Sequence, residues 1–171
     1  MLRKLLLVVL VLAFSHQALA FPGETRRYFK DWLVNCMSDS AGTCRAVTSV
    51  RNKALFPYGD GTIFQLTVQR DKQNDYHIEF YHTLEGSYPA DTATFQVDQE
   101  PVMTMKLDRT HSLNEGRLTN EQTRQLLPLL KSGRWLTISY TSQKGKEVEL
   151  TLSLRGVTAS LLFVDEHILR K

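Results

Sequence analysis

Two cysteines are the residues of this sequence whose type and spacing most directly suggest chemistry. Cys36 and Cys44 are the only cysteines, and seven residues, among them Asp39 and Gly42, separate them. A redox-active pair usually has two residues between its cysteines, at the start of a helix. A structural zinc site needs four ligands, and two thiols supply only half of them. Because Asp and Gly favour turns, the spacing instead predicts a structural disulfide that joins the ends of two strands.

Histidines are the next candidates, as metal ligands or general bases. His77 and His82 are five positions apart, which on a regular strand places their side chains on opposite faces. His111 and His167 are distant in sequence, and although a fold could bring two histidines together, no H-E-x-x-H or H-x-H pattern is present. The Gly-Asp-Gly run at 59–61 could hold calcium or an anion, but two glycines more often mark a turn with positive φ. The sequence therefore predicts no metal site and no cofactor.

Carboxylates and serines complete the search for a catalytic set. Asp165 and Glu166 invite interpretation as paired acid and base groups, but adjacent residues on a helix point about 100° apart and would not share one substrate. Structural capping or salt bridging is the preferred interpretation, and Arg155 and Arg170 are possible partners, although the spacing does not select either. Ser87 lies in E-G-S-Y-P, which lacks the second glycine of a nucleophile elbow. We therefore predict no catalytic residues.

The elements that must position the cysteines are visible as alternating patterns. Trp32, Val34 and Cys36 recur at every second position, so a strand here would turn Trp32 inward beside Cys36. Similar patterns predict strands over 44–51, 64–69, 76–81, 94–97 and 102–107. The connections between these strands are too short for parallel crossovers, so the sheet is predicted to be antiparallel.

A helix is predicted to follow this run of strands. Thr119 and Gln122 have the spacing of a capping box. Pro128 falls inside the apolar stretch that follows and is expected to break or kink the helix. Gly133 is placed to end it.

A second hairpin and a closing helix complete the predicted order. Alternating apolar residues over 136–140 and 148–154 predict two strands that face the same core. Gly156 lets the backbone turn from the second strand into a short helix without a steric penalty. The small residues Ala159 and Ser160 are expected to let that helix lie close against a sheet.

The beginning of the chain has the three parts of a secretory signal peptide. Arg3 and Lys4 precede an apolar run over 5–14, and Ala18-Leu19-Ala20 supplies the small residues of a cleavage site. The apolar run is shorter than the roughly 20 residues that span a bilayer. We therefore expect a signal peptide over 1–20, cleavage after Ala20, and one β-rich envelope domain over 21–171 that is periplasmic or secreted and has no membrane span.

Charge argues against a nucleic-acid partner. The whole chain has 21 Lys and Arg against 18 Asp and Glu, and loss of the basic leader brings the mature domain close to neutral. Nucleic-acid binding usually needs a basic surface. Arg26, Arg27 and Lys30 could touch an anionic lipid or polymer, but a solvated chain end is the preferred interpretation.

Two patches of the sequence resemble a known family. The pattern F-x-D-W-x-V-x-C over 29–36 and the run S-L-R-G-V-T-A-S-L-L-F-V-D-E over 153–166 are similar to an exported bacterial family of unknown function. That family is related to invasion-associated locus B proteins. Ile168 stands where the family pattern would place a glutamine, whereas Arg170 fits the pattern. The resemblance implies a periplasmic or secreted β-rich domain without an established active site.

These observations predict a mainly β fold, an antiparallel β-sandwich or open barrel with two short helices and one disulfide. The favoured function is a non-catalytic exported envelope domain, an interaction or structural module for an envelope or host protein. A periplasmic hydrolase of an envelope polymer and a carrier of a small apolar ligand remain as alternatives. A histidine that meets a serine and a carboxylate in a deep cleft would favour the hydrolase, and a long empty apolar cavity would favour the carrier.

Overall fold

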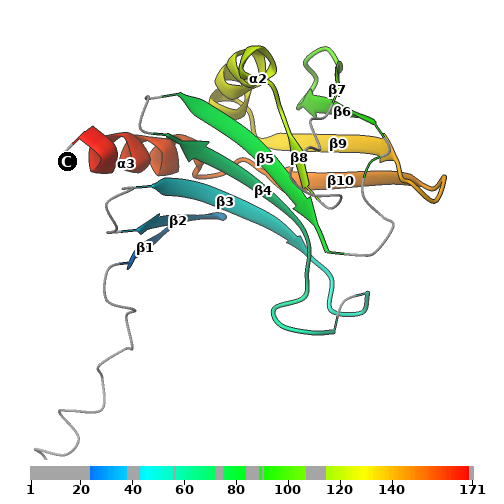
Figure 1. The fold of residues 1–171 in the computed structure, drawn as a ribbon, viewed down its shortest axis with the longest axis horizontal. Coiled ribbons are helices and arrows are strands. Elements are labelled where there is room, and N and C mark those ends of the chain that lie inside the picture. Colours follow the sequence, from blue (N-terminus) through cyan, green and yellow to red (C-terminus); the bar gives the residue numbers. More distant parts are fainter. Residues whose placement is uncertain are drawn as a thin grey trace, which may run out of the picture.

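The computed structural model of the protein describes residues 24–37, 43–55, 57–71, 75–83, 89, 91–106 and 115–169. Residues 1–20, where a signal peptide with cleavage after Ala20 is expected, lie outside these ranges, as do Ser87, His111 and Arg170. The described residues build two sheets and two helices (Figure 1).

The larger sheet has six strands in the order β1-β2-β3-β4-β5-β8, and every neighbouring pair is antiparallel. Its strands are β1 (Glu24–Phe29), β2 (Trp32–Met37), β3 (Cys44–Arg51), β4 (Thr62–Arg70), β5 (Tyr76–His82) and β8 (Glu115–Arg117). From β2 to β5 each strand pairs with the next one in the chain, as the alternating patterns predict.

The smaller sheet has four antiparallel strands in the order β10-β9-β6-β7. Its strands are β6 (Thr92–Val97), β7 (Met103–Lys106), β9 (Trp135–Thr141) and β10 (Glu147–Ser153). The predicted fold class is therefore confirmed: the protein is mainly β, and its two antiparallel sheets do not close into a barrel.

Both helices pack beside the larger sheet. Helix α3 (Val157–Leu169) contacts β1, β2 and β3, while α2 (Asn120–Ser132) contacts β5 and α3 (Figure 1). The four-stranded sheet covers another part of the same inner face, because β10 contacts β3. No helix within the described ranges is long and apolar enough to cross a membrane.

The start of α2 follows the predicted capping box. The Thr119 side chain accepts from the Gln122 backbone N–H, and the Gln122 side chain accepts from the Thr119 backbone N–H. The helix ends at Gly133, as predicted. Of the break or kink expected at Pro128, the break is wrong, since the helix continues to Ser132.

Packing explains why the proline does not end α2. Leu126 and Leu130 lie on either side of Pro128 and are both fully buried. Most helix stability in proteins comes from burying such an apolar face, so this contact offsets the hydrogen bond that the proline cannot make. The Ser132 hydroxyl also donates a hydrogen bond to the Pro128 carbonyl at 3.2 Å.

Aromatic side chains connect the two sheets. Trp32 is fully buried, and its Nε1 donates to the Ser153 carbonyl on β10 at 3.0 Å. The Phe80 ring lies 5.7 Å from Phe64 on its own sheet and 6.2 Å from Phe95 on the other. The inward alternation of the strands thus forms one continuous core.

Gly156 occupies a position that no other residue could take without strain. Its φ is 98°, and a Cβ built there would lie 1.9 Å from the Phe29 carbonyl oxygen. The glycine lets β10 turn directly into α3 against the β1–β2 turn.

The two small residues of α3 differ in burial. Ser160 is fully buried, but Ala159 is exposed, so the expectation that Ala159 packs against the sheet is wrong.

Strand β1 was not predicted, because residues 26–30 were expected to form a solvated chain end. The strand pairs residue by residue with β2, from Glu24 opposite Met37 to Phe29 opposite Trp32. Its central residues are exposed on both faces, so the sequence carries no apolar alternation. The three-residue strand β8 was missed for a similar reason, since it is too short to show a period.

Candidate functional site

Four residues form a single row on the inner face of the larger sheet, near the end of β2. Cys36 pairs with Cys44, Cys44 with Arg70, and Arg70 with Tyr76, in successive strands. We call these four residues the clasp row. The predicted disulfide between Cys36 and Cys44 is confirmed, and both cysteines are buried. The row therefore places a covalent bond, a cation and a phenol side by side.

Asp165 of α3 closes over the charged half of the clasp row. Arg70 Nη1 donates to Asp165 Oδ1 at 2.5 Å, and the Tyr76 hydroxyl donates to the same oxygen. Burial, reinforced by the Asp165 carboxylate, raises the pKa of Tyr76 well above its usual value. The Arg70 guanidinium and the Lys131 ammonium also lie 5.2 and 5.4 Å from the centre of the Tyr76 ring. These groups satisfy one another and hold α3 on the sheet.

The partner of Asp165 is a residue that the sequence spacing did not single out. Asp165 pairs with Arg70, 95 positions away, whereas Arg155, one of two possible partners named from the sequence, lies 3.9 Å from Asp31. Glu166, the neighbouring carboxylate, is exposed. The two acidic residues thus point to different surroundings, which agrees with their divergence on a helix.

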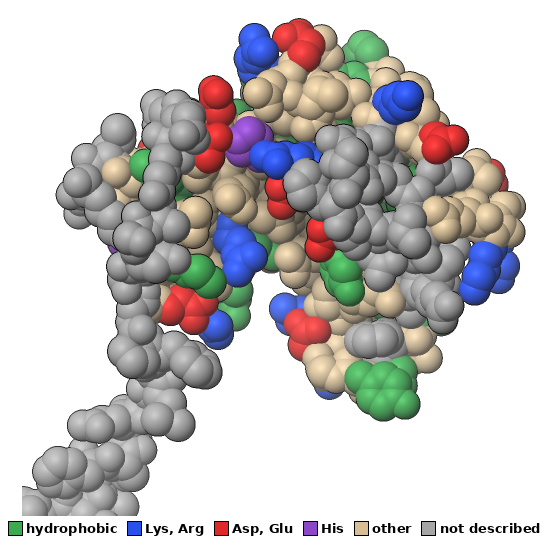
Figure 2. Space-filling model, in the orientation of Figure 1, with side chains coloured by type: hydrophobic (Ala, Val, Ile, Leu, Met, Phe, Trp, Pro, Cys, Tyr) green, Lys and Arg blue, Asp and Glu red, His purple; other side chains and the backbone are tan. Residues whose placement is uncertain are grey.

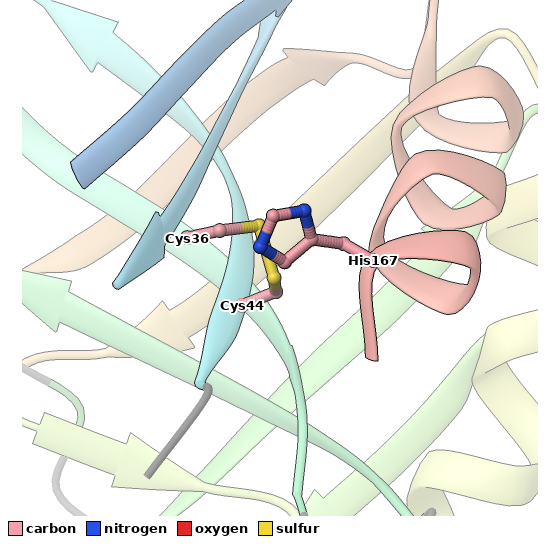
Figure 3. Close-up of side chains that lie close together, drawn as sticks. All are labelled: Cys36, Cys44 and His167. Carbon is pink, nitrogen blue, oxygen red and sulfur yellow. A yellow bond between two sulfur atoms is a disulfide. The ribbon is translucent and has the colours of Figure 1, made fainter. Parts of the chain in front are cut away.

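His167 lies beside the disulfide, a position that the sequence analysis did not predict. Its imidazole extends from α3 to the disulfide (Figure 3), and a ring nitrogen and the two sulfur atoms all lie within 4.8 Å of one another. The ring stacks on Phe163 with centroids 6.0 Å apart. One signal was present in the sequence, since His167 follows Phe163 by one helical turn beside the apolar stripe of α3.

The other described histidines lie on β5. His77 is on the outer face, with Nε2 2.6 Å from Asp71 Oδ2, whereas His82 is buried on the inner face between Phe64 and Tyr140. Burial lowers the pKa of His82 to about 4. The two histidines are therefore separated by the sheet.

An open cleft of about 510 Å³ lies at the other end of the β2–β3 pair. It is bounded by the β1–β2 turn, by β3 and β4, and by the edge of β10; we call it the edge cleft. Lys30, Leu33, Val47 and Thr151 contribute to its mixed polar and apolar walls. Tyr28 stands at its border with 72% of its surface exposed.

The edge of β10 that faces this cleft is not paired with another strand. Leu154 N donates to Arg134 O across the pair with β9, which means that the backbone groups of Glu149 and Thr151 point away from β9. Ser153 O on the same edge accepts from Trp32 Nε1. The outward backbone groups of Glu149 and Thr151 have no hydrogen-bond partner among the described residues.

The Gly-Asp-Gly run at 59–61 forms a turn beside the edge cleft. Gly59 and Gly61 both have positive φ, at 58° and 77°. Asp60 Oδ1 accepts from Thr62 N at 3.0 Å. Hydrogen bonds from the Thr62 side chain and then from its backbone hold the pKa of Asp60 below its usual value. The carboxylate thus stabilises the turn by accepting hydrogen bonds from Thr62.

Charged side chains are interspersed by sign on the face of the molecule shown in Figure 2. Lys and Arg side chains lie among Asp and Glu side chains there, and this face shows no large patch of a single charge sign. This view agrees with the similar numbers of basic (21) and acidic (18) residues in the chain.

Comparisons with known proteins add a family and a fold. A family model described as "Protein of unknown function (DUF1176)" matches residues 26–170. The crystal structure of invasion associated protein B from Bartonella henselae is similar with a TM-score of 0.62, at 14% identity over 83% of this chain and 96% of that chain. At that identity the likeness is one of fold. No curated protein matches the sequence.

Proposed function

Because this chain belongs to the DUF1176 family of unknown function and has a fold like that of invasion associated protein B, we propose that it is a non-catalytic exported envelope domain that binds another protein. Both relationships agree with the resemblance seen in the sequence. The proposal includes a signal peptide over 1–20, cleavage after Ala20, and a mature domain over 21–171. The disulfide supports export, since such bridges persist in oxidising compartments.

The observation that carries the proposal is the unpaired edge of β10 beside the edge cleft. An extended segment of a partner protein can add to such an edge through backbone hydrogen bonds, while its side chains enter the neighbouring depression. Glu149 and Thr151 present the required backbone groups. Tyr28, an exposed aromatic residue at the border of the cleft, belongs to a residue type that often anchors interfaces. The partner is therefore an extended segment of an envelope or host protein.

The two alternative functions have less support from the described residues. A carrier needs an enclosed apolar cavity, whereas the edge cleft is open and includes Lys30 and Asp31 in its walls. A hydrolase needs a histidine beside a nucleophile in a cleft. His77 contacts Asp71 on the outer face of the sheet, and His82 is buried in the core. The unpaired edge favours binding over both.

The binding test removes one backbone donor from the edge. Thr151→Pro eliminates the outward N–H but breaks no bond to β9, and proline is tolerated on edge strands. Thr151→Val is the matched control, because it keeps the N–H and changes only an exposed side chain. A photo-reactive amino acid at position 28 should cross-link a discrete partner in envelope preparations of the parent and of Thr151→Val. The yield should fall at least tenfold with Thr151→Pro.

Two results would count against strand addition. Unchanged cross-linking in a Thr151→Pro variant with parental circular dichroism would show that the edge is not used. Failure to capture a discrete partner with the probe at position 28 would remove the edge cleft from the proposal.

Export has its own test. N-terminal sequencing of the protein from an envelope fraction should return Phe21 as the first residue, because signal peptidase cleaves after small residues such as Ala20. Recovery of a chain that begins at Met1 from the cytoplasm would contradict the assignment.

A further inference from the structure

We propose that Cys36, Cys44 and His167 form a metal site when the disulfide is reduced, and that this site binds one zinc-class divalent ion. The inference goes beyond the proposed binding function and does not depend on it, because the three residues lie at the opposite end of the β2–β3 pair from the edge cleft.

Geometry is the first argument. The fold brings the two cysteine sulfurs of β2 and β3, here joined as a disulfide, and one imidazole nitrogen from α3 to within 4.8 Å of one another (Figure 3). Zinc bonds of about 2.3 Å to sulfur and about 2.0 to 2.1 Å to nitrogen place neighbouring ligand atoms roughly 3.6 to 3.8 Å apart in a tetrahedron. The imidazole needs to approach by about 1.2 Å or less, and the sulfurs separate once their bond is broken.

The imidazole is already oriented for this role. Its ring stacks on Phe163 at an interplanar angle of 27°, and Phe163 in turn packs against Phe29 at 5.5 Å. Arg27 lies over the rings of both phenylalanines. A ligand whose ring is held by packing loses less conformational freedom when it binds a metal.

Reduction of the Cys36–Cys44 disulfide requires a two-electron donor, and a dithiol can serve as that donor. The dithiol transfers two electrons and two protons, the Cys36–Cys44 bond breaks to give two thiols, and the reductant becomes a disulfide. Binding of the metal then releases both thiol protons, and His167 donates the lone pair of a neutral ring nitrogen. In the oxidised protein the two sulfurs are bonded to each other, so neither is available as a thiolate.

Charge and burial also suit such an ion. Two thiolates neutralise a divalent cation, so the filled site carries no net charge in the buried surroundings of Cys36 and Cys44. Thiolate and imidazole are the donors that zinc prefers. Because His167 is only partly buried, water can reach the fourth position on its side of the site.

Cobalt and zinc titrations of the mature protein test the inference. After reduction with a phosphine, the parent should bind one Co²⁺ per chain and develop thiolate-to-metal absorption, and Zn²⁺ should remove that absorption. The oxidised parent should show none. His167→Ala should weaken Zn²⁺ binding at least tenfold. His77→Ala is the matched control and should bind like the parent, since His77 lies on the outer face of the sheet.

Reduction could also loosen the fold, and near-ultraviolet circular dichroism covers that case. If the reduced parent loses its signal, Zn²⁺ should restore it in the parent and in His77→Ala but not in His167→Ala, because a ligand stabilises the state that binds it. The proposal is overturned if the reduced parent neither binds Co²⁺ nor recovers its signal with Zn²⁺. It is also overturned if His167→Ala and His77→Ala bind Zn²⁺ equally well.

Discussion

The two ends of the β2–β3 pair differ in how far their interactions are completed within the protein. At the clasp row, Cys36 and Cys44 are covalently joined and Arg70 and Asp165 are paired, with α3 packed over them. At the edge cleft, the strands border an open depression, and the outward backbone groups of β10 near Thr151 are not hydrogen-bonded to another strand among the described residues.

The difference shows how one sheet can serve two purposes. Interactions that bring distant parts of the chain together stabilise the native state, so the clasp row should contribute to folding. An unpaired edge contributes little to folding but can bind an added strand. Substitutions in the clasp row and in the buried core should therefore change stability more than substitutions of exposed residues at the edge cleft.

Trp32→Ala should have the largest effect. Trp32 is fully buried and connects the start of β2 to Ser153, so its removal leaves a large cavity and an unpaired carbonyl. The expected loss in the free energy of unfolding is roughly 3 to 5 kcal/mol. Urea unfolding beside Trp135→Ala, a control at an exposed tryptophan (51%), measures it. A neutral Trp32→Ala would contradict the assignment of stability to this core.

Replacement of both Cys36 and Cys44 by serine should have the next largest effect. Loss of the bridge releases the unfolded chain from a short loop, which lowers the free energy of unfolding by about 2 to 3 kcal/mol in the chain-entropy model. The measurement is urea unfolding of the double variant. Thiol titration of the unfolded parent without reductant is the control and should detect no free thiol. Two free thiols would show that no disulfide joins Cys36 and Cys44, and the stability assigned to the bridge would then be absent.

Asp165→Asn should be less severe. The amide keeps the shape of the side chain but leaves Arg70, whose side chain is 11% exposed, without its carboxylate. We expect a loss of about 1.5 kcal/mol, because hydrogen bonds to charged groups are stronger than neutral ones. Glu166→Gln on the exposed side of α3 is the matched control in thermal unfolding. Equal effects of the two variants would show that the ion pair does not hold α3.

His82 gives a smaller effect that depends on pH. It lies on the inner face beside Phe64, in the half of β5 that is farther from the clasp row, and its pKa falls from about 6.5 when unfolded to about 4 when buried. Below pH 6.5 the unfolded chain takes up a proton that the folded protein refuses, so stability falls as pH is lowered toward 4.

The expected loss from His82 is about 1 kcal/mol between roughly pH 7.5 and 5.5. Urea unfolding at several pH values measures it. The slope should be smaller in His82→Leu, which cannot titrate. An unchanged slope would assign the pH dependence to other groups.

Tyr28→Ala should have the smallest effect on folding. Tyr28 is 72% exposed at the border of the edge cleft, so its removal should change the free energy of unfolding by less than about 0.5 kcal/mol. Urea unfolding provides the measurement. A loss as large as that of the double cysteine variant would mean that both ends of the strand pair contribute equally to folding, and the comparison would fail.

Local patterns of the sequence determined much of this fold. Alternation at every second residue predicted the hairpins and the inward side of Trp32, and the Thr119–Gln122 spacing predicted the start of α2. The turn-favouring residues between Cys36 and Cys44 in the sequence predicted the disulfide. These features depend on residues that are close in the chain, so the sequence carries them directly.

Only the tertiary structure decided which distant residues meet. Strand β1 is an exposed edge with no apolar period, and α2 continues past Pro128 because leucines on both sides are buried. The pairing of Arg70 with Asp165 and the approach of His167 to the disulfide depend on how α3 docks across the strands. The edge cleft likewise depends on the order of strands in two sheets. Side-chain periodicity specifies which face of an element is buried, but the packing of one element on another specifies which residues become neighbours.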